Sequence, residues 1–302
     1  MSDAIVCTGL SKRYGSTQAL KGVSLTVPQG GVFGLIGPNG AGKTTLFSII
    51  LGYIAPSEGE VRVLGVKPRE LFRLQGKVSA LPQDADMPPT LSVRETLRFF
   101  ARLNGIANIE AEVDRVLKVV DMSSWANARL RALSHGMKKR VFIAQALLGD
   151  PDLILLDEPS AGLDPKHAYE LGQIFKSQRA TVLMSSHNLA ELEDLCDRAA
   201  ILVKGDVVRQ GTMDEIRNAD QELHIHIVSS SVDQARLMRE VPGVVATYDR
   251  ELGKVTLRFT ATVERPSERV TTEALQALMA QGAMIREVER GQSLLQTYLS
   301  LS

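Results

Sequence analysis

One stretch of the sequence decides the fold: Gly37-Pro38-Asn39-Gly40-Ala41-Gly42-Lys43-Thr44-Thr45. It follows the apolar run Val32–Ile36 and precedes the apolar, helix-compatible residues 46–51. Its glycines can adopt backbone angles closed to other residues, so successive N–H groups can turn toward phosphate oxygens at the positive end of the next helix. Lys43 adds a mobile cation, and Thr44 adds a hydroxyl of the kind that ligates Mg²⁺. The stretch therefore predicts a phosphate-binding loop between a strand and a helix, and a bound nucleotide.

Composition and charge indicate a folded chain without a strong net field. The chain has 302 residues, 44% of them hydrophobic, and 35 Lys plus Arg balance 35 Asp plus Glu. This length suggests about two domains, and the zero net charge disfavours attraction of the whole molecule to nucleic acid or anionic lipid. Cys7 and Cys196 are too few for a disulfide scaffold, so we expect two buried thiols in a reducing compartment.

The sequence offers no segment that would place it in a membrane. No apolar stretch follows its start as a secretory signal would, and no run of about 18 apolar residues is long enough to span a bilayer. If the protein works on a membrane, we expect another chain to cross it.

Two carboxylates end the most apolar strand candidate. Residues 153–156 are unbroken apolar residues, and Asp157 and Glu158 follow at once. Such a run is typical of a strand buried on both faces of a parallel sheet, and ligands of such sheets bind at the carboxyl ends of the strands. We therefore expect Asp157 to hold Mg²⁺ through water and Glu158 to orient and deprotonate an attacking water. A buried pair of acids without a cation would be costly.

Two more polar residues follow apolar runs. Gln83 comes after residues 78–81, where it could reach Mg²⁺ or the attacking water, although a loop glutamine alone is unremarkable. His187 comes after residues 180–184. At the carboxyl end of a parallel strand it would face the nucleotide and could sense or stabilise the γ-phosphate; a core histidine is the alternative.

A third group of candidates lies on turns and at a helix start. Leu133-Ser134-His135-Gly136-Met137 opens a helix in which Ser134 is a natural N-cap, and Gly136 leaves the first turn bare enough for an anion. A capped helix without a ligand is the simpler interpretation. Tyr14, predicted to lie in a turn between two short strands, could pack at a hinge or lie against an adenine face.

Together these motifs resemble the ATP-binding cassette (ABC) ATPases. The phosphate loop, Gln83, residues 133–137, residues 153–158, Leu163-Asp164 and His187 occur in the order of that family, over about residues 5–212. The resemblance implies an α/β fold, the P-loop NTPase cassette with a RecA-like core, an antiparallel β subdomain and a helical subdomain at about residues 88–150. It implies an ATP-binding domain of residues 1–219.

The resemblance also implies ATP and Mg²⁺ as cofactors and a homodimer. ATP would lie between the phosphate loop of one subunit and Ser134 and Gly136 of the other, with hydrolysis coupled to dimer opening. The implied catalytic residues are Glu158, His187, Lys43 and Gln83, and the implied metal ligands are Thr44, Gln83 and Asp157. The implied nucleotide contacts are Tyr14, Gly37, Pro38, Asn39, Gly40, Ala41, Gly42, Lys43, Thr44, Thr45, Ser134, Gly136 and Asp164.

One departure from the family pattern lies in the signature motif, which usually reads Leu-Ser-Gly-Gly-Gln. Here His135 and Met137 stand at the third and fifth positions. Because Ser134 and Gly136 are kept, and because His is tolerated at unusual backbone angles, we expect activity to survive.

Residues 89–97 and the form Ser-x-Gly-Met resemble exporters of the drug, sodium and copper-enzyme maturation type, whose membrane subunits are separate polypeptides. The resemblance implies an ATP-hydrolysing subunit, peripheral on the cytoplasmic face of the cell membrane, that drives integral membrane permease subunits. The alternative is a soluble ABC-type ATPase that acts as a mechanical switch on a nucleic-acid or ribosomal partner. The sequence contains one cassette, shows no heptad run and has zero net charge. These properties disfavour that alternative, so we expect no nucleic acid partner.

Residues 220–302 carry a pattern of their own. Alternation and helical periodicity predict the order βαββαβ, which suits a small accessory α+β domain of the ferredoxin-like type. Residues 293–299 resemble the terminal helix of the exporters' ATPases, with Leu295 and Gln296 replacing its usual acidic pair. His224 and His226 alternate on one predicted strand, as a metal pair or as part of an exposed polar face.

Overall fold

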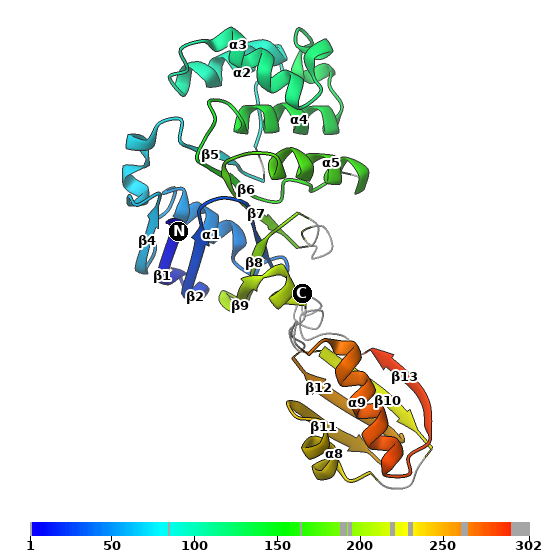
Figure 1. Cartoon of the computed structure of the whole chain (residues 1–302). Coiled ribbons are helices and arrows are strands. Elements are labelled where there is room, and N and C mark those ends of the chain that lie inside the picture. Colours follow the sequence, from blue (N-terminus) through cyan, green and yellow to red (C-terminus); the bar gives the residue numbers. More distant parts are fainter. Residues whose placement is uncertain are drawn as a thin grey trace. The chain divides into compact units, whose positions relative to one another are not determined.

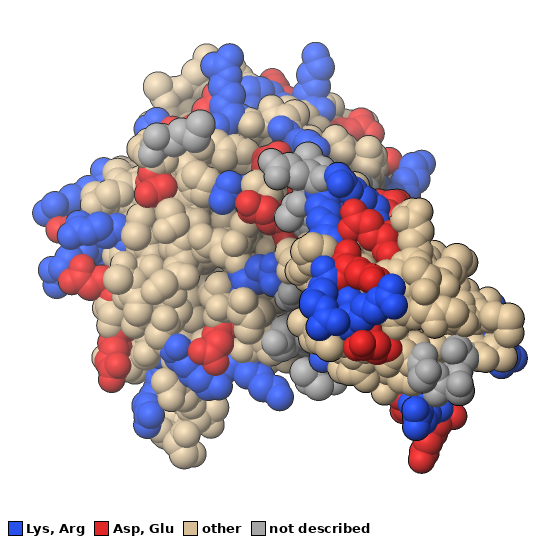
Figure 2. Space-filling view, turned by 60° about the horizontal axis from the view of Figure 1, so that its bottom comes forward, with Lys and Arg blue, Asp and Glu red and all other residues tan. Residues whose placement is uncertain are grey.

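The computed structural model describes residues 2–83, 85–163, 165–187, 192, 195–217, 221–228, 232–260 and 265–290. The chain divides into two compact units, Met1–Gln210 and Gly211–Ser302, which are described separately (Figure 1). On the face shown in Figure 2, Lys and Arg side chains are interspersed with Asp and Glu rather than gathered into a field of one sign. This pattern agrees with the zero net charge of the sequence.

The first unit is organised around a sheet with the strand order β5-β6-β7-β3-β8-β9. The strands are β5 (Val78–Leu81), β6 (Leu153–Leu156), β7 (Thr181–Ser186), β3 (Val32–Ile36), β8 (Arg198–Val203) and β9 (Asp206–Thr212). The first five pair in parallel along that order. Every residue of β3, β6 and β7 is buried, as expected for central strands of a parallel sheet. The residues that follow β3, β5, β6 and β7 therefore meet at one edge.

An antiparallel sheet shares its core with this structure. It has the order β2-β1-β4, formed by β1 (Asp3–Tyr14), β2 (Thr17–Pro28) and β4 (Glu58–Val63), and η1 (Pro68–Leu74) follows it. One cluster of buried side chains includes Ile5 and Val61 from this sheet, Leu35 of β3, and Leu46 of α1 (Lys43–Ile50). The shared core fixes the end of β3 relative to the start of α1, and so fixes the loop between them.

The strands at the start of the chain are longer than predicted. β1 runs through Tyr14 and pairs it with Thr17, so the prediction that Tyr14 lies in a turn was wrong. Register shifts along the β1–β2 pair interrupt the regular alternation, which explains why the sequence pattern broke off before the strand ended.

A helical region lies between β5 and β6. It contains α2 (Val93–Leu103), α3 (Ile109–Val119), η2 (Ser123–Trp125), η3 (Leu130–Ala132) and α4 (His135–Ala146), and α5 (Pro165–Lys176) follows β6. A capping box, for which the spacing of Ser92 and Glu95 is typical, starts α2: Glu95 N donates to Ser92 Oγ at 3.2 Å and Ser92 N donates to Glu95 Oε2 at 2.8 Å.

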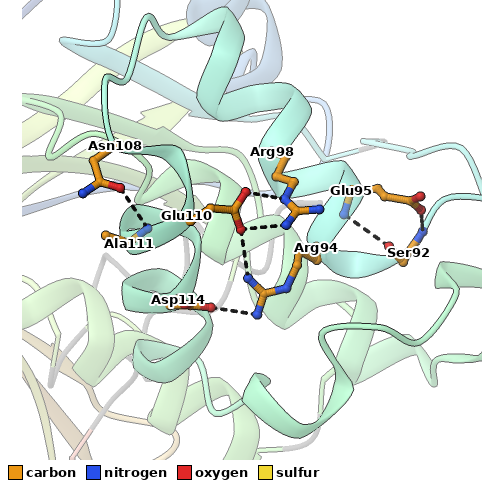
Figure 3. A network of polar contacts seen from close by, with 8 residues as sticks. All are labelled: Ser92, Arg94, Glu95, Arg98, Asn108, Glu110, Ala111 and Asp114. Carbon is orange, nitrogen blue, oxygen red and sulfur yellow. Dashed lines mark hydrogen bonds and ion pairs between the residues drawn. The ribbon is translucent and has the colours of Figure 1, made fainter.

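Ion pairs join α2 to α3 on their exposed sides (Figure 3). Arg98 donates to both oxygens of Glu110 at 2.7 Å, and Arg94 lies 2.7 Å from Asp114 and 3.4 Å from Glu110. The hydrogen bonds from Arg98 lower the pKa of the Glu110 carboxyl. Exposed pairs contribute little energy individually, but a bidentate network fixes the orientation of two helices.

A short ladder of backbone hydrogen bonds joins residues 89–93 to residues 128–131, on either side of the segment that contains α2 and α3. Arg131 N donates to Pro89 O at 3.1 Å, Leu130 N to Leu91 O at 3.0 Å, and Val93 N to Ala128 O at 3.0 Å. The chain that comes from Gln83 is therefore hydrogen-bonded to the chain that leads into Ser134.

The second unit contains α7 (Met213–Arg217) and the predicted order βαββαβ. The elements are β10 (Gln221–Ile227), α8 (Gln234–Glu240), β11 (Val244–Asp249), β12 (Lys254–Phe259), α9 (Ser267–Ala280) and β13 (Ile285–Arg290). The strands pair antiparallel in the order β11-β12-β10-β13, and one face of this sheet shares a core with α8 and α9. This is the ferredoxin-like arrangement. The predicted terminal helix at residues 293–299 lies outside the described residues.

The two histidines of β10 lie on the sheet face opposite that core. His224 Nδ1 is 3.3 Å from Thr256 Oγ1, and His226 Nε2 is 3.8 Å from Glu289 Oε2. Among the residues that the structure describes, no group of three or more His, Cys, Asp or Glu could hold a metal ion. The geometry favours the polar-face interpretation of this pair.

Candidate nucleotide-binding site

The loop 37–42 is pressed against main chain from two other strands. A Cβ on Gly37 would lie 2.3 Å from Leu202 O, and a Cβ on Gly42, whose φ is 107°, would lie 2.7 Å from Ala19 O. Only glycine fits these positions. Gly42 is also the N-cap of α1 and offers no side chain to its first N–H groups, which leaves these donors for an anion.

Lys43 is held inside the loop that precedes it. The residue is only 5% exposed, and its Nζ donates to Gly37 O at 2.6 Å and to Pro38 O at 3.2 Å. The same ammonium lies 3.2 Å from Glu158 Oε1. The cation predicted to serve the outer phosphates thus contacts the carboxylate predicted to act on water.

Asp157 and Glu158 follow β6 and are buried, with 4% and 6% exposure. Glu158 has a φ of 50°, a left-handed conformation that is rare outside glycine and costs on the order of 1–3 kcal/mol. Its N–H donates to Ser185 Oγ at 2.9 Å, and the Ser185 hydroxyl donates to Asp157 Oδ1 at 2.6 Å. One hydroxyl on the neighbouring strand β7 therefore holds both acids.

The Glu158 carboxylate is flanked by two basic groups. Oε2 lies 2.9 Å from His187 Nδ1, and Oε1 faces Lys43 without a hydrogen bond from any described residue. Lys139, a buried residue of α4, is a third basic group, and its pKa responds to the negative charge of Glu158. Burial lowers the pKa of the Lys139 ammonium, and the Glu158 carboxylate opposes that shift. The Glu158 carboxylate therefore contacts one basic group through each of its oxygens.

A cavity of about 210 Å³ opens over these groups. Its described lining residues are Ala19, Asn39, Gly40, Ala41, Gly42, Lys43, Thr44, Thr45, Gln83 and Glu158. The structure therefore brings the phosphate loop together with Gln83 and Glu158, while Asp157 is not among the described lining residues and is linked to Glu158 through the Ser185 hydroxyl.

Other predicted residues lie away from this cavity. Tyr14 is 50% exposed and has Lys12 Nζ 5.2 Å from its ring centroid, a cation–π contact. Ser134 caps α4 by accepting from Met137 N at 3.3 Å, and neither it nor Gly136 is among the described lining residues. Asp164 lies outside the described residues.

Sequence reasoning missed Ser185 and Ala19. Ser185 lies in a fully buried strand, where a hydroxyl interrupting an apolar run is a signal that it satisfies a polar neighbour. Ala19 carries no such signal, because it acts through the position of its backbone against Gly42.

The donor set suits a nucleotide-bound Mg²⁺ rather than a metal held by the protein alone. A hydroxyl of Thr44, an amide of Gln83 and the carboxylate of Glu158 line the cavity, and the carboxylate of Asp157 is linked to Glu158 through Ser185. Mg²⁺ keeps several waters and usually takes one or two carboxylates plus substrate phosphates.

The first unit has a parallel sheet, with a glycine-bounded loop at the start of a helix and with a buried lysine and buried acids at the same edge. These features define a phosphate-loop nucleotide-hydrolysing protein. A family model described as "ABC transporter" matches residues 20–161. The chain belongs to the ABC transporter family, as one of its ATP-binding and ATP-hydrolysing subunits. The predicted cassette fold and family are confirmed.

Relatives and solved structures agree with this assignment. The chain is 38% identical to "Nod factor export ATP-binding protein I" of Rhizobium meliloti (strain 1021), over 69% of this chain and 64% of that protein. It is 33% identical to "Linearmycin resistance ATP-binding protein LnrL" of Bacillus subtilis (strain 168), over 76% of each chain. The structure of cbiO1 from Clostridium perfringens, described as part of the ABC transporter complex cbiONQ, matches with a TM-score of 0.64 and 28% identity, over 72% of this chain and 91% of that one.

Two further findings bear on the sequence predictions. No helix among the described ranges is long and apolar enough to cross a membrane. Cys7 and Cys196 are both buried, as predicted, and burial raises the pKa of the Cys7 thiol to about 12.

Replacing Lys43 by Ala is expected to lower ATP affinity by more than about tenfold, because it removes a charged donor that no backbone N–H replaces. Isothermal titration with ATP measures the change, and circular dichroism checks the fold. Lys118→Ala, an exposed lysine on α3, is the matched control. Unchanged affinity in a folded Lys43→Ala protein would refute the assignment of the phosphate loop.

Replacing Ser185 by Ala is expected to lower the free energy of unfolding by about 1–3 kcal/mol, because it leaves Asp157 Oδ1 and Glu158 N buried without this partner. Urea unfolding measures the difference. Ser177→Ala, at an exposed serine, should change stability far less. Equal effects of the two substitutions would show that Ser185 does not hold the acids.

Proposed function

We propose that this chain uses ATP hydrolysis to drive separate membrane subunits of an exporter. The observation that carries the proposal is the arrangement of Glu158. It is buried beside the phosphate-loop cavity and contacts Lys43 and His187, and its oxygen that faces Lys43 accepts no hydrogen bond from a described residue.

Binding of ATP releases Glu158 from its contact with Lys43. The phosphates accept hydrogen bonds from N–H groups of the loop and of the first turn of α1, and Lys43 exchanges its contact with Glu158 for one with the outer phosphates. Glu158 then orients the attacking water and accepts its proton. His187, 2.9 Å from the other carboxylate oxygen, holds Glu158 in place and faces the γ-phosphate. Tyr14 lies against the adenine.

Thr44, Gln83 and Asp157 are the residues that would hold Mg²⁺. Bound with the nucleotide, Mg²⁺ would neutralise charge on the phosphates. The chain's own contribution is to fix Asp157 through Ser185 and to present Thr44 from the first turn of α1.

A second copy of the chain completes the site. Ser134, Gly136 and Asp164 of one copy contact the nucleotide bound by the other. Two observations support this: Ser134 and Gly136 are absent from the described lining of their own chain's cavity, and Ser134 caps the N-terminus of α4, where anions bind favourably.

Export and a membrane partner are supported by the relatives. Nod factor export and linearmycin resistance are the roles in two relatives' names, and cbiO1 is described as part of a transporter complex. We place this chain at the cytoplasmic face of the cell membrane, bound to permease subunits. The alternative of a soluble switch on nucleic acid is not favoured, since the face in Figure 2 carries mixed charge.

We assign ATP binding and hydrolysis to residues 1–219, and residues 220–302 to an accessory domain that supports the dimer or the contact with the membrane subunits; the compact units divide nearby, after Gln210. The separate core of the second unit supports this, because the described buried residues of that cluster all lie between Leu223 and Ala283.

Glu158→Gln is expected to bind ATP but to lose about 10²- to 10⁴-fold in turnover, the usual contribution of a general base. The variant should accumulate as an ATP-bound dimer in size-exclusion chromatography. Glu60→Gln, at an exposed acid of β4, should keep normal turnover. Full turnover by a monomeric Glu158→Gln protein would exclude the proposed role.

A chain that ends near Asn218 is expected to bind ATP normally and to associate more weakly with its membrane partner. Co-purification with that partner and ATP turnover are compared between the short and full chains. A folded short chain without ATP binding would place the domain boundary elsewhere. Normal association of the short chain with the membrane partner, together with normal coupling of ATP hydrolysis, would exclude the proposed accessory role.

A further inference from the structure

The signature residue that departs from the family pattern contacts the turn that follows Glu158. His135 is the first residue of α4 and is exposed to solvent on its outer side. A Cβ on Gly162 would lie 3.1 Å from His135 Nε2 and 3.6 Å from Cδ2, so the imidazole rests directly against the Gly162 backbone. Beside this contact, the Leu163 side chain lies 3.9 Å from where a Cβ on Gly136 would be. The start of α4 and this turn therefore fit together at two adjacent points.

The turn that His135 contacts begins at a strained residue. Glu158 has a φ of 50°, which is unfavourable for glutamate, and Gly162 has a φ of 79°, which glycine adopts readily. Ala161 N donates to Glu158 O at 3.2 Å, and Leu163 N donates to Ser160 O at 2.9 Å. A strained backbone persists only where its surroundings over-determine it. Ser185 holds the Glu158 end of this turn, and the His135 ring supports the Gly162 end.

We propose that His135 is a positioning residue for ATP hydrolysis, whose ring supports Gly162 and thereby holds the turn that orients Glu158. The inference rests on the proposed role of Glu158 as the base. The support is one of shape: a planar ring fills the space over a residue that has no side chain. His135 therefore affects turnover through Glu158, and ATP binding by the phosphate loop of the same chain does not depend on it.

Steady-state ATP hydrolysis by the full chain tests this separation. His135→Ala should lower kcat about tenfold, because small misplacements of a reacting group cost large factors in rate, while the KM for ATP and the affinity for ADP stay within about twofold. His135→Phe, which keeps a planar ring and loses the nitrogens, should restore more than half of kcat. Lys138→Ala on the same helix is the control and should leave kcat unchanged. Loss of rescue by Phe, or a change in KM instead of kcat, would overturn the proposal.

A double-mutant cycle shows whether His135 acts through Gly162. Gly162→Ala should lower kcat in the parent chain, both from strain at positive φ and from collision with the ring. In a His135→Gly chain the collision is gone, so the same Gly162→Ala change should cost at least about threefold less in kcat. Independent effects of the two substitutions would overturn the proposal and would indicate that His135 acts elsewhere, for example on a nucleotide bound by a second copy.

A Glu158→Gln chain distinguishes failure of this inference from failure of the proposed function. In that chain His135→Ala should cause no further loss of turnover, because the residue it positions has lost its function. If Glu158→Gln alone retains full turnover, the proposed function fails and this inference fails with it. If Glu158→Gln is inactive while His135→Ala turns over normally in the parent chain, this inference alone fails. Thermal unfolding of each variant confirms that all compared proteins are folded.

Discussion

The ion pair between Lys43 and Glu158 is the interaction on which the site depends. Both side chains are almost fully buried, and their charged atoms are 3.2 Å apart. Burying either charge alone would cost several kcal/mol, so each makes the burial of the other possible. In the proposed mechanism a nucleotide would replace one anion beside Lys43 with another, and the carboxylate that it displaces would be the group that activates water. Nucleotide binding and release of Glu158 would then be one exchange of partners at Lys43, and without nucleotide the ion pair leaves neither buried charge unpaired.

The rest of the first unit serves to hold this pair in place. Lys43 is fixed because Gly37 and Gly42 lie against the backbones of Leu202 and Ala19, where no side chain would fit. Glu158 is fixed because Ser185 satisfies its N–H from the neighbouring strand, despite a backbone conformation that is unfavourable for glutamate. The Ser185 contact comes from the order of strands in the parallel sheet, which places β7 beside β6, whereas the loop glycines lie against β8 of that sheet and β2 of the antiparallel sheet.

Features set by local sequence could be predicted, and features set by distant contacts could not. The phosphate loop, the buried strand before Asp157, the capping box at Ser92 and the βαββαβ order all follow from residues close together in the chain. The contact of Ser185 with Asp157 joins residues 28 positions apart, and it exists only because β6 and β7 are neighbours. The fit of His135 on Gly162 likewise depends on how α4 packs. Tyr14 was misplaced because bulges between β1 and β2 hide the continuity of the strand.

The ladder between residues 89–93 and 128–131 has a consequence for how motion spreads through the chain. Its hydrogen bonds tie the two ends of the segment that contains α2 and α3, and the ion pairs of Figure 3 join those helices to each other. We expect the segment that contains α2 and α3 to move as one rigid body, because bending it would break several hydrogen bonds and ion pairs at once. Displacement of the chain beyond Gln83 would therefore be transmitted to the chain that leads into Ser134. Gln83 and Ser134 are far apart in the sequence, but the hydrogen bonds between the segments that follow Gln83 and precede Ser134 couple their movements.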